Sequence, residues 1–424
     1  MILEIRLENF YSIKEEILLD FRAAKINNER SKALSDNVMD YNGQNILKSI
    51  GLYGANASGK SNIITAISRC CQIILKSHQN NEGHIFNFSP FKFDNYPGKP
   101  SSFYINFVYE KIEYEYSFSL TKTEILTESL YYYPNGRRAK VFTRDESKGG
   151  SKQKIYNFSD GLIPRPFDVA TNTSKKTLFL SRASQMDRDF CKKIYMFFLA
   201  YFWQGYAPLN YQQYGFKDIY QSFEQNKKLI LHALSICDSD IADIRIVHEK
   251  HKGSIPDAFS NVIYKPNIDM QSFETFHKAA PETSFDLFGE ESAGTTQLFN
   301  MLFFLLDTIQ NGKTFIFDEF DLSLHTKIAE FVIDLFHAGS SSQFLFTTHN
   351  TNLINVKRFR RDQIMFVNKK DDGSTELYSL FDHKDFRDNM DAEKGYLQGR
   401  FDAIPIVNTE LSSLRKLLEA NQSI

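Results

Sequence analysis

The first ten residues alternate apolar and polar side chains with a period of two, which predicts a strand with one covered face. The residues from Phe21 to Asn45 are polar and weakly patterned. Ile46 to Leu52 then leads into a glycine-containing loop, and Ser61 to Lys76 repeats apolar residues at three- and four-residue intervals. This order predicts a strand, a loop and a helix.

The middle of the chain changes pattern several times. Phe88 to Leu130 alternates aromatic and polar residues, which predicts two or three antiparallel strands. Thr143 to Asn172 is rich in Ser, Lys, Gly and Pro and predicts a surface loop or linker. Residues 175–240 predict a helical insert, in which the apolar run Ile194–Trp203 is a buried helix because a membrane span needs roughly 20 residues.

The last third alternates again between helical and strand-like patterns. Ile244 to Val262 is strand-like, and Asp286 to Thr348 alternates helix and buried strand before a charged C-terminal stretch. We therefore expect four parts: an N-terminal lobe with the glycine loop and an antiparallel β-lobe (1–142), a linker with the helical insert and returning strands (143–285), a second α/β lobe (286–380), and a tail packed on or extending the head (381–424).

Composition narrows the class of protein without naming a partner. The chain has 50 Lys and Arg against 52 Asp and Glu, so its net charge of −2 gives no sign of a nucleic-acid or membrane partner. A hydrophobic content of 42% excludes wholesale disorder. The cysteines show no metal or disulfide spacing and the first residues do not resemble a signal peptide, so we expect a cytoplasmic protein; the four are Cys70, Cys71, Cys191 and Cys237. Cys70 and Cys71 lie on the predicted helix, where core packing is expected.

Gly54–Ser61 matches the phosphate-binding pattern GxxxxGK[ST], between a predicted strand and a predicted helix. Backbone N–H groups of such a loop surround a phosphate, Lys60 neutralises phosphate oxygens, and the Ser61 hydroxyl can ligate Mg²⁺. The alternative is an ordinary glycine turn with a surface lysine. We predict ATP binding by Gly54, Ala55, Asn56, Ala57, Ser58, Gly59, Lys60, Ser61 and Asn62.

Two later strands end in polar side chains. The run Thr314–Phe317 leads into Asp318 and Glu319, as in a buried parallel strand that presents acids at its carboxyl end. We expect Asp318 to hold Mg²⁺ and Glu319 to polarise the attacking water. The next strand ends in His349, which is a candidate sensor of the γ-phosphate, or else a structural histidine.

Glu291–Thr296 precedes an apolar helix and resembles the signature motif of ABC-type ATPases. Ser292 and Gly294 match the serine and glycine that touch the γ-phosphate of ATP held by a partner subunit, with Ala293 between them. The motif is divergent, because Glu291 and Ala293 stand where the better-known form has leucine and glycine. An ordinary helix N-cap by Ser292 is the alternative.

The order of all these motifs resembles the nucleotide-binding heads of the SMC, RecF and OLD group of ABC-type ATPases. Asp321–His325 and the opening segment Glu8–Ile13 also match this group, whereas no glutamine loop is assigned in residues 80–110. The resemblance implies an α/β fold: a P-loop NTPase with an ABC/SMC-like two-lobe head, formed by an antiparallel β-lobe and a parallel-sheet core, and a helical insert.

A narrower resemblance covers nearly the whole chain. Pro90–Phe93, Phe179–Ser181 and Tyr396–Pro405 are similar to stand-alone AAA/ABC ATPases of bacterial and archaeal phage-defence operons, including the ATPase subunits of AbiL-type abortive-infection systems and of the PARIS system. It implies Mg²⁺-dependent ATP hydrolysis in a head-to-tail homodimer or higher homo-oligomer, which acts as a sensor or scaffold for a separately encoded effector protein. The catalytic residues would be Lys60, Ser292, Glu319 and His349.

Other functions fit less well. A DNA-acting clamp of the RecF or SMC kind, in repair or restriction, is the main alternative, with a short basic run that could meet phosphates or be a solvated face: Lys357, Arg358, Arg360 and Arg361. A transporter cassette or a metabolic kinase fits worse. Only 75 residues follow His349, so we expect no Toprim nuclease domain. Four acids at three-residue steps predict a solvated helical face rather than a metal site: Asp382, Asp385, Asp388 and Asp391.

Overall fold

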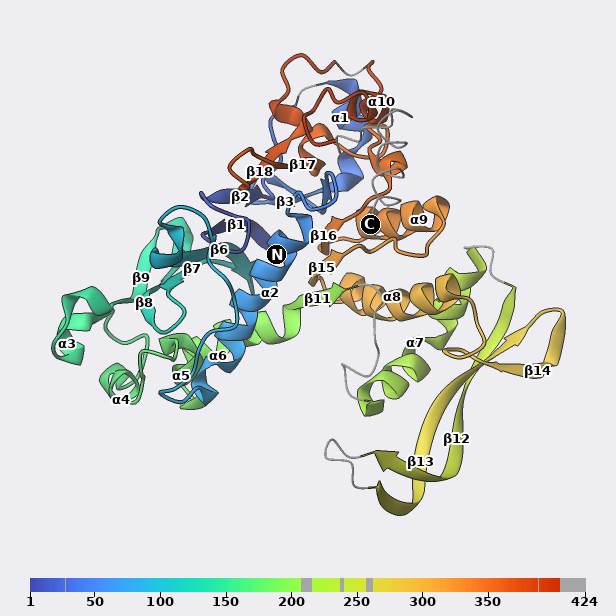
Figure 1. Ribbon diagram of the computed structural model, residues 1–424, viewed down its shortest axis with the longest axis horizontal. Helices are drawn as coiled ribbons and strands as arrows, with labels where there is room; N and C mark the ends of the chain where they lie inside the picture. The colour runs from blue at the N-terminus through green and yellow to red at the C-terminus, as the bar shows by residue number, and fades with distance from the viewer. Residues whose placement is uncertain (27, 207–215, 237–239, 257–261, 388, 405–424) are drawn as a thin grey trace, which may run out of the picture.

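The fold is organised around two large sheets that share one helix (Figure 1). The computed structural model describes residues 1–26, 28–206, 216–236, 240–256, 262–387 and 389–404. The N-terminal β-lobe lies on one side of helix α2 (Lys60–Lys76), and the strands of the core sheet lie on the other (Figure 1). The phosphate-loop sequence therefore sits where the two lobes meet.

The core sheet has six strands in the order β11-β15-β16-β5-β17-β18. The first five are parallel, and β18 returns antiparallel to β17. The strands are β5 (Ser49–Tyr53), β11 (Phe202–Tyr206), β15 (Thr314–Asp318), β16 (Gln343–Thr347), β17 (Ile364–Lys369) and β18 (Thr375–Ser379).

The two faces of this sheet bury alternate side chains in two different cores. Ile316 and Leu345 pack into the cluster that contains the apolar face of α2. Their neighbours Phe317 and Phe346 pack into the cluster around α8 (Ala293–Gln310) and α9 (Thr326–Ala338). Successive strand residues point to opposite faces, so a continuous apolar run is what a sheet covered on both sides requires.

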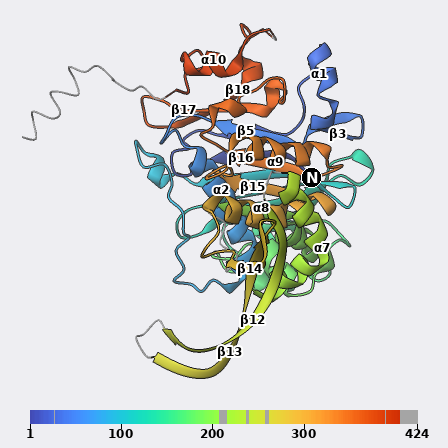
Figure 2. The ribbon, with the colours of Figure 1, turned by 90° about the vertical axis from the view of Figure 1, so that its right-hand side faces the viewer.

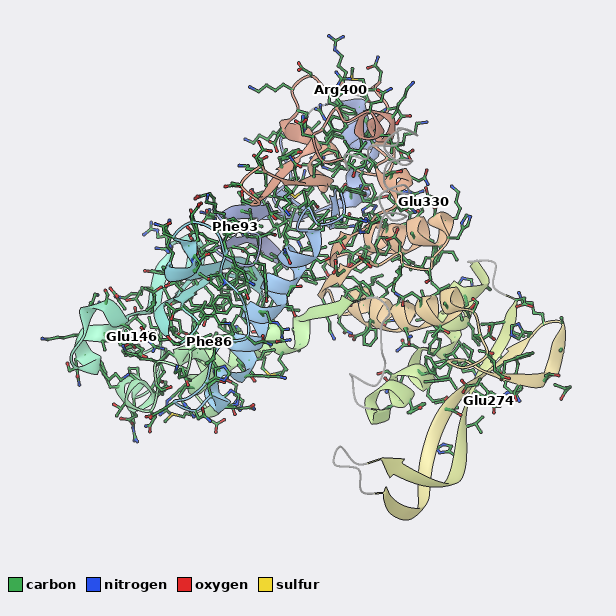
Figure 3. The ribbon with its side chains drawn as sticks, viewed as in Figure 1. Phe86, Phe93, Glu146, Glu274, Glu330 and Arg400 are labelled. Atoms are coloured by element: carbon green, nitrogen blue, oxygen red, sulfur yellow. The ribbon has the colours of Figure 1, made fainter. Side chains whose placement is uncertain are left out.

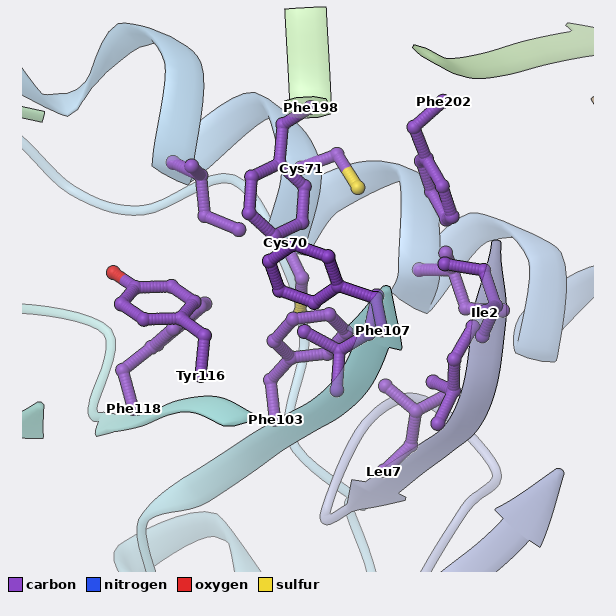
Figure 4. Close-up of a cluster of buried hydrophobic side chains, with 14 of the residues drawn as sticks. Ile2, Leu7, Cys70, Cys71, Phe103, Phe107, Tyr116, Phe118, Phe198 and Phe202 are labelled. Atoms are coloured by element: carbon purple, nitrogen blue, oxygen red, sulfur yellow. The ribbon is translucent and has the colours of Figure 1, made fainter. Parts of the chain in front are cut away.

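The second large sheet is antiparallel throughout, in the order β10-β9-β8-β7-β6-β1-β2. Its strands are β1 (Ile2–Glu8), β2 (Ile17–Asp20), β6 (Ser101–Tyr109), β7 (Ile112–Leu120), β8 (Ile125–Tyr132), β9 (Ala139–Asp145) and β10 (Tyr156–Phe158). Figure 4 shows how Ile2 of β1 and Phe103 and Phe107 of β6 gather with Cys70 and Cys71 of α2. The two cysteines are core residues, as predicted.

Smaller elements complete the fold. A three-stranded sheet carries a long hairpin that extends away from the rest of the molecule (Figures 1 and 2). It consists of β12 (Ile241–Pro256), β13 (Val262–His277) and β14 (Ala280–Asp286), and a further pair is β3 (Val38–Tyr41) with β4 (Gln44–Leu47). The other helices are α1 (Glu29–Ala33), α3 (Lys152–Ile155), α4 (Pro166–Thr171), α5 (Phe179–Gln185), α6 (Asp189–Met196), α7 (Phe216–Ile236) and α10 (Ala392–Leu397). Within the described ranges, no helix is both long and apolar enough to cross a bilayer.

Three predictions about these elements need correction. The linker predicted at Thr143–Asn172 is wrong, because this stretch contains the end of β9, all of β10 and the short helices α3 and α4. The helix predicted over Ile194–Trp203 ends at Tyr201, and β11 follows directly because its backbone pairs with β15. The helical face predicted for the acids after residue 380 is also wrong.

Two of the acids after residue 380, Asp382 and Asp391, act as caps. Asp382 closes a short 3₁₀ turn by accepting the Ser379 N–H, and Asp391 is the N-cap of α10. Asp388 lies outside the described residues, as do Cys237 and Pro405. The antiparallel strands predicted within Phe88–Leu130 are confirmed as β6, β7 and most of β8.

Candidate functional site

The phosphate loop joins the central strand β5 to the start of α2. Gly59 has φ +114° and immediately precedes the helix, where a Cβ atom would lie 2.1 Å from Thr375 Oγ1. A Cβ atom on Gly54 would lie 2.2 Å from the Val367 carbonyl oxygen. Position 59 therefore needs glycine both for its backbone conformation and for space, and position 54 needs it for space alone.

An open cavity of about 740 Å³ lies over this loop, and most of its lining was predicted from the sequence. The lining residues are Ser12, Ala55, Asn56, Ala57, Ser58, Gly59, Lys60, Ser61, Asn62, Glu319, His349 and Lys369. Sequence reasoning did not assign Ser12 or Lys369 to the site. Ser12 belongs to the segment Glu8–Ile13, which resembles the opening of the SMC, RecF and OLD group, whereas Lys369 ends β17 and has no motif around it.

Lys60 points back into its own loop. Its Nζ atom donates to the carbonyl oxygens of Gly54 at 2.7 Å and Ala55 at 3.1 Å. Burial lowers the pKa of Lys60 to about 8, against the opposing attraction of Asp318 and Glu319. Within the described part of the chain, the ammonium group is therefore held in the cavity by two carbonyl oxygens.

The acids at the end of β15 are held by the neighbouring strand and by α2. The Ser61 hydroxyl donates to Asp318 Oδ1 at 3.2 Å, and the Thr347 hydroxyl donates to the same oxygen at 2.6 Å. The chain turns sharply after Asp318, since Glu319 has φ +52° and its N–H donates to Thr347 Oγ1 at 2.7 Å. This turn directs the Glu319 carboxylate into the cavity.

His349 stands opposite Glu319, with 3.7 Å between Nε2 and Oε1. Burial and the nearby Lys60 charge lower the pKa of His349, although Glu319 raises it. The imidazole is therefore neutral at pH 7 and can both donate and accept a hydrogen bond. The next acid along the chain, Asp321, accepts the Thr348 hydroxyl at 2.7 Å, and burial raises its pKa.

These groups fit a nucleotide phosphate and Mg²⁺. Among the described residues, the Ser58 hydroxyl is buried in the loop and has no hydrogen-bond partner. The N–H groups at the start of α2 point at the same space. The oxygens of Ser61 and Asp318 are the hard ligands that Mg²⁺ prefers when substrate phosphates and water supply the rest. The described residues contain no group of three or more His, Cys, Asp or Glu that could hold a metal without such help.

The signature residues lie at the start of α8 and outside the lining of this cavity. Ser292 is the N-cap of α8, and its hydroxyl accepts the Thr295 N–H at 3.1 Å. Gly294 lies close to the loop after β15, because a Cβ atom there would be 3.0 Å from the Ser323 carbonyl oxygen. The N-cap interpretation is confirmed, and the Ser292 hydroxyl remains exposed.

The unusual Glu291 has a structural role. It is nearly buried, and its carboxylate accepts hydrogen bonds from the Thr275 hydroxyl and from His277 Nε2, the latter at 2.7 Å. Asp240 binds the other ring nitrogen of His277, also at 2.7 Å. The divergent residue therefore ties the start of α8 to the base of the β12–β13 hairpin.

The basic run after β16 does not form an open cationic face. Arg358 contacts Glu330 at 3.4 Å and is also hydrogen-bonded to Asp334. Arg360 is only 6% exposed and pairs with Asp362 at 2.8 Å. Arg361 donates to a backbone carbonyl, so three of the four cations in this run are engaged within the chain.

Fold and site together define the class of protein. A glycine loop between β5 and α2, acids at the end of β15 and an antiparallel lobe packed on α2 form a P-loop NTPase with a two-lobe head and a helical insert. The chain belongs to the family described as "AAA domain, putative AbiEii toxin, Type IV TA system", whose model matches residues 49–355, more than half of the 424-residue chain. It is thus an AAA-type ATPase-domain protein.

Several solved structures are similar to this chain. The SmcHead bound to the C-winged helix domain of ScpA has 17% identity and a TM-score of 0.40, with 89% of this chain and 97% of that chain covered. An SMC head domain from Thermotoga maritima has 14% identity and a TM-score of 0.39, with 89% and 98% covered. An Smc head domain with an extended coiled coil, bound to the C-terminal domain of ScpA derived from Pyrococcus furiosus, has 14% identity and a TM-score of 0.37, with 89% and 96% covered. No curated protein matches the chain.

Proposed function

We propose that the protein hydrolyses ATP with Mg²⁺ and works as a homodimer or a higher homo-oligomer that holds nucleotides between facing heads. One observation carries this proposal. Lys60, Glu319 and His349 line a single cavity, whereas Ser292 and Gly294 lie at the start of α8 and do not line it. A second copy would supply the missing signature residues to that cavity.

Each residue would have a distinct role. The loop amides and Lys60 bind the phosphates, and Ser61 and Asp318 are the groups that would hold Mg²⁺. A bound Mg²⁺ ion would neutralise phosphate charge during the transfer. Glu319 would accept a proton from the attacking water, and the neutral His349 would orient that water or the γ-phosphate. Ser292 of a second copy would stabilise the charge that develops on the γ-phosphate.

The output proposed for this cycle is regulation of a separately encoded effector protein, most fittingly in anti-phage defence. The family description supports this, because it names a toxin and a toxin–antitoxin system. The sequence resemblance to AbiL-type and PARIS ATPase subunits points the same way. Closure of two heads around ATP would change the surface that an effector meets, since ligand binding shifts the chain between open and closed states.

A DNA clamp remains the alternative, but its sequence support is weakened. The proposal for DNA contact rested on the basic run, and Arg358 and Arg360 are engaged in ion pairs with acids of the same chain. A phosphate backbone would have to compete with those partners. We therefore favour the regulatory function.

The decisive experiment mixes two inactive variants. Lys60→Ala has a damaged phosphate loop and an intact signature, whereas Ser292→Arg has the reverse. If active sites form between two copies, an equimolar mixture regains a substantial part of the wild-type ATPase rate, because a mixed dimer has one intact composite site. A mixture that stays as inactive as its components contradicts the shared site.

A second measurement tests the role of Glu319 and the oligomer together. Glu319→Gln should bind ATP, stop hydrolysing it and accumulate as a dimer or larger assembly by light scattering. Glu376→Gln, an exchange of the same kind on β18, is the matched control and should behave as the wild type. A Glu319→Gln protein that hydrolyses ATP normally as a monomer contradicts the assignment.

A further inference from the structure

A continuous chain of side-chain hydrogen bonds runs beside the phosphate loop. The Asn62 amide Nδ2 lies 2.7 Å from Ser12 Oγ, which lies 2.7 Å from Thr375 Oγ1. Thr375 Oγ1 in turn lies 2.9 Å from the Ser58 carbonyl oxygen. We call this chain the hydroxyl relay; it joins α2, the β1–β2 loop, β18 and the phosphate loop.

The direction of every hydrogen bond in the hydroxyl relay is fixed by its ends. The Asn62 NH₂ group can only donate and the Ser58 carbonyl can only accept. Thr375 must therefore donate to the carbonyl and accept from Ser12, which in turn accepts from Asn62. Because each hydroxyl proton has one place, removing either hydroxyl interrupts the relay and weakens the hydrogen bonds that remain.

Both hydroxyls of the relay are carried by backbone that is firmly held. The Thr375 N–H donates to the Ser12 carbonyl oxygen at 2.7 Å, so the two residues are also joined by their main chains. Lys14 lies two residues after Ser12 and reaches Asp372 of the β17–β18 turn at 2.8 Å and Asp94 at 2.9 Å. The hydrogen bond between Lys14 and Asp372 raises the pKa of Lys14 above its usual range and lowers the pKa of Asp372 below its own.

The same turn also packs against an aromatic ring of the β-lobe. Phe93, labelled in Figure 3, lies against Gly373, where a Cβ atom would be 2.9 Å from the ring. The β17–β18 turn is thus held by the ion pair between Lys14 and Asp372 and by Phe93. The residues that hold the relay in place therefore lie in the β17–β18 turn and the β-lobe, outside the phosphate loop.

The relay ends at the point where the loop must be shaped for phosphate. The Ser58 carbonyl oxygen accepts a hydrogen bond from the Thr375 hydroxyl, while the buried hydroxyl of Ser58 has no partner among the described residues. Gly59 follows with φ +114° and no room for a side chain beside Thr375. Holding the Ser58 carbonyl fixes the peptide between Ser58 and Gly59, and with it the aim of the Gly59 N–H.

We propose that Ser12 and Thr375 are positioning residues of the nucleotide site, which act through the Ser58 carbonyl to preset the phosphate loop and which couple nucleotide binding to the β-lobe and the β17–β18 turn. This inference rests on the proposed ATP binding. Neither residue needs to touch the phosphates, because a loop that already has its binding conformation loses less conformational entropy when the phosphates bind.

The test compares two variants of Thr375. Thr375→Val keeps the shape and removes the hydroxyl, whereas Thr375→Ser keeps the hydroxyl. For Thr375→Val we expect the Kd for ATP to rise about tenfold, the effect of losing the hydrogen bond that holds the Ser58 carbonyl, with kcat at saturating ATP within about twofold of the wild type. Thr375→Ser should restore the wild-type Kd. A merely structural role would lower Tm without this split between Kd and kcat.

A double-mutant cycle tests whether the relay acts as a unit. Ser12→Ala should also raise the Kd about tenfold, and the double variant with Thr375→Val should be no weaker than either single variant. The proposal is overturned if the rise in Kd of the double variant is the product of the two single rises, or if the Kd of either single variant is unchanged. If Thr375→Val does not fold, the Kd of Ser12→Ala decides alone, because Ser12 is partly exposed.

The same measurements separate this inference from the proposed function. A wild-type protein that binds no ATP by calorimetry refutes the proposed function and, with it, the inference. If the wild type binds ATP and both Ser12→Ala and Thr375→Val bind it equally tightly, the positioning role of the relay is refuted and the proposed function stands.

Discussion

The hydroxyl of Thr347 lies between the two acids at the end of β15: it donates to Asp318 Oδ1 at 2.6 Å and accepts the Glu319 N–H at 2.7 Å. Thr347 ends β16, which pairs in parallel with β15, so the two strands end at the same edge of the sheet. A single buried side chain therefore sets the positions of the carboxylate expected at Mg²⁺ and of the one expected at the water.

Replacing Thr347 should harm catalysis and stability together. Thr347→Val leaves the Glu319 N–H without its partner and frees the Asp318 carboxylate, so we expect a loss of about 1–3 kcal/mol of unfolding free energy and a raised Mg²⁺ requirement for hydrolysis. Urea unfolding and a Mg²⁺ titration of the ATPase rate measure the two effects. Thr347→Ser keeps the hydroxyl and should stay near the wild type. A Thr347→Val protein with the normal Mg²⁺ requirement speaks against this role.

Adding one methyl group to Gly59 should abolish ATP binding. Gly59→Ala combines a left-handed backbone with a Cβ atom 2.1 Å from Thr375 Oγ1, so the loop and the β17–β18 turn must separate. Gly43→Ala is a matched control, because Gly43 has φ +80° but nothing within 4 Å of the added carbon. We expect about 1 kcal/mol of destabilisation and normal ATP affinity for the control. Equal ATP affinity in both variants contradicts the clash.

ATP affinity should fall as the pH rises through about 8. Burial lowers the pKa of Lys60 to about 8 in the protein without nucleotide, and a bound phosphate favours the charged amine and raises that pKa again. Binding above pH 8 must therefore take up a proton, which calorimetry in buffers of different ionisation enthalpy detects. Lys60→Arg keeps its charge at every pH and should lose this dependence. A wild-type affinity that is equal at pH 7 and pH 9 contradicts the mechanism.

The start of α8 should loosen as the pH rises above 6.5 and through the raised pKa of His277. The hydrogen bond that His277 donates to Asp240, and then the one that it donates to Glu291, raise the pKa of His277 above its ordinary value of 6.5. The stability from the charged ring is thus fully present below 6.5 and is lost as the pH rises through the raised pKa. Urea midpoints between pH 5 and 9 should show this loss in the wild type and much less of it in Asp240→Asn. A parallel pH profile in the variant contradicts it.

The sequence predicted the site best where neighbours in the chain are neighbours in space. Gly54–Ser61 spans one strand end and one helix start, so its pattern contains its own context. Asp318 and His349 could be placed together because parallel strands end at one edge of a sheet. Ser12 lies in a turn and Thr375 begins β18, by contrast, more than 300 residues apart in the chain, and isolated hydroxyl residues carry no periodic signal.

The failures have physical reasons of the same kind. The stretch 143–172 looks like a surface loop because it is polar, yet Arg144 is 2% exposed, lies 3.8 Å from the buried Glu128 and donates to the Thr177 carbonyl oxygen at 2.7 Å. Glu128 in turn accepts the N–H groups of Phe179 and Leu180 at the start of α5. Buried charged groups are indistinguishable from solvated ones in sequence. The apolar run up to Trp203 has no feature that separates the end of a helix from the start of β11.

The strand order of the core sheet has a consequence for the newly made protein. The phosphate loop leaves β5, but both neighbours of β5 lie some three hundred residues later, in β16 and β17, and the Ala55 N–H is held by the carbonyl of Ala403 at 2.9 Å. In a nascent chain, some three hundred residues must therefore be made after the phosphate-loop sequence before the strands that shape it exist. We expect ribosome-bound chains that end before Thr375 to bind no ATP, because the strands and the hydroxyl that hold the phosphate loop have not yet been made.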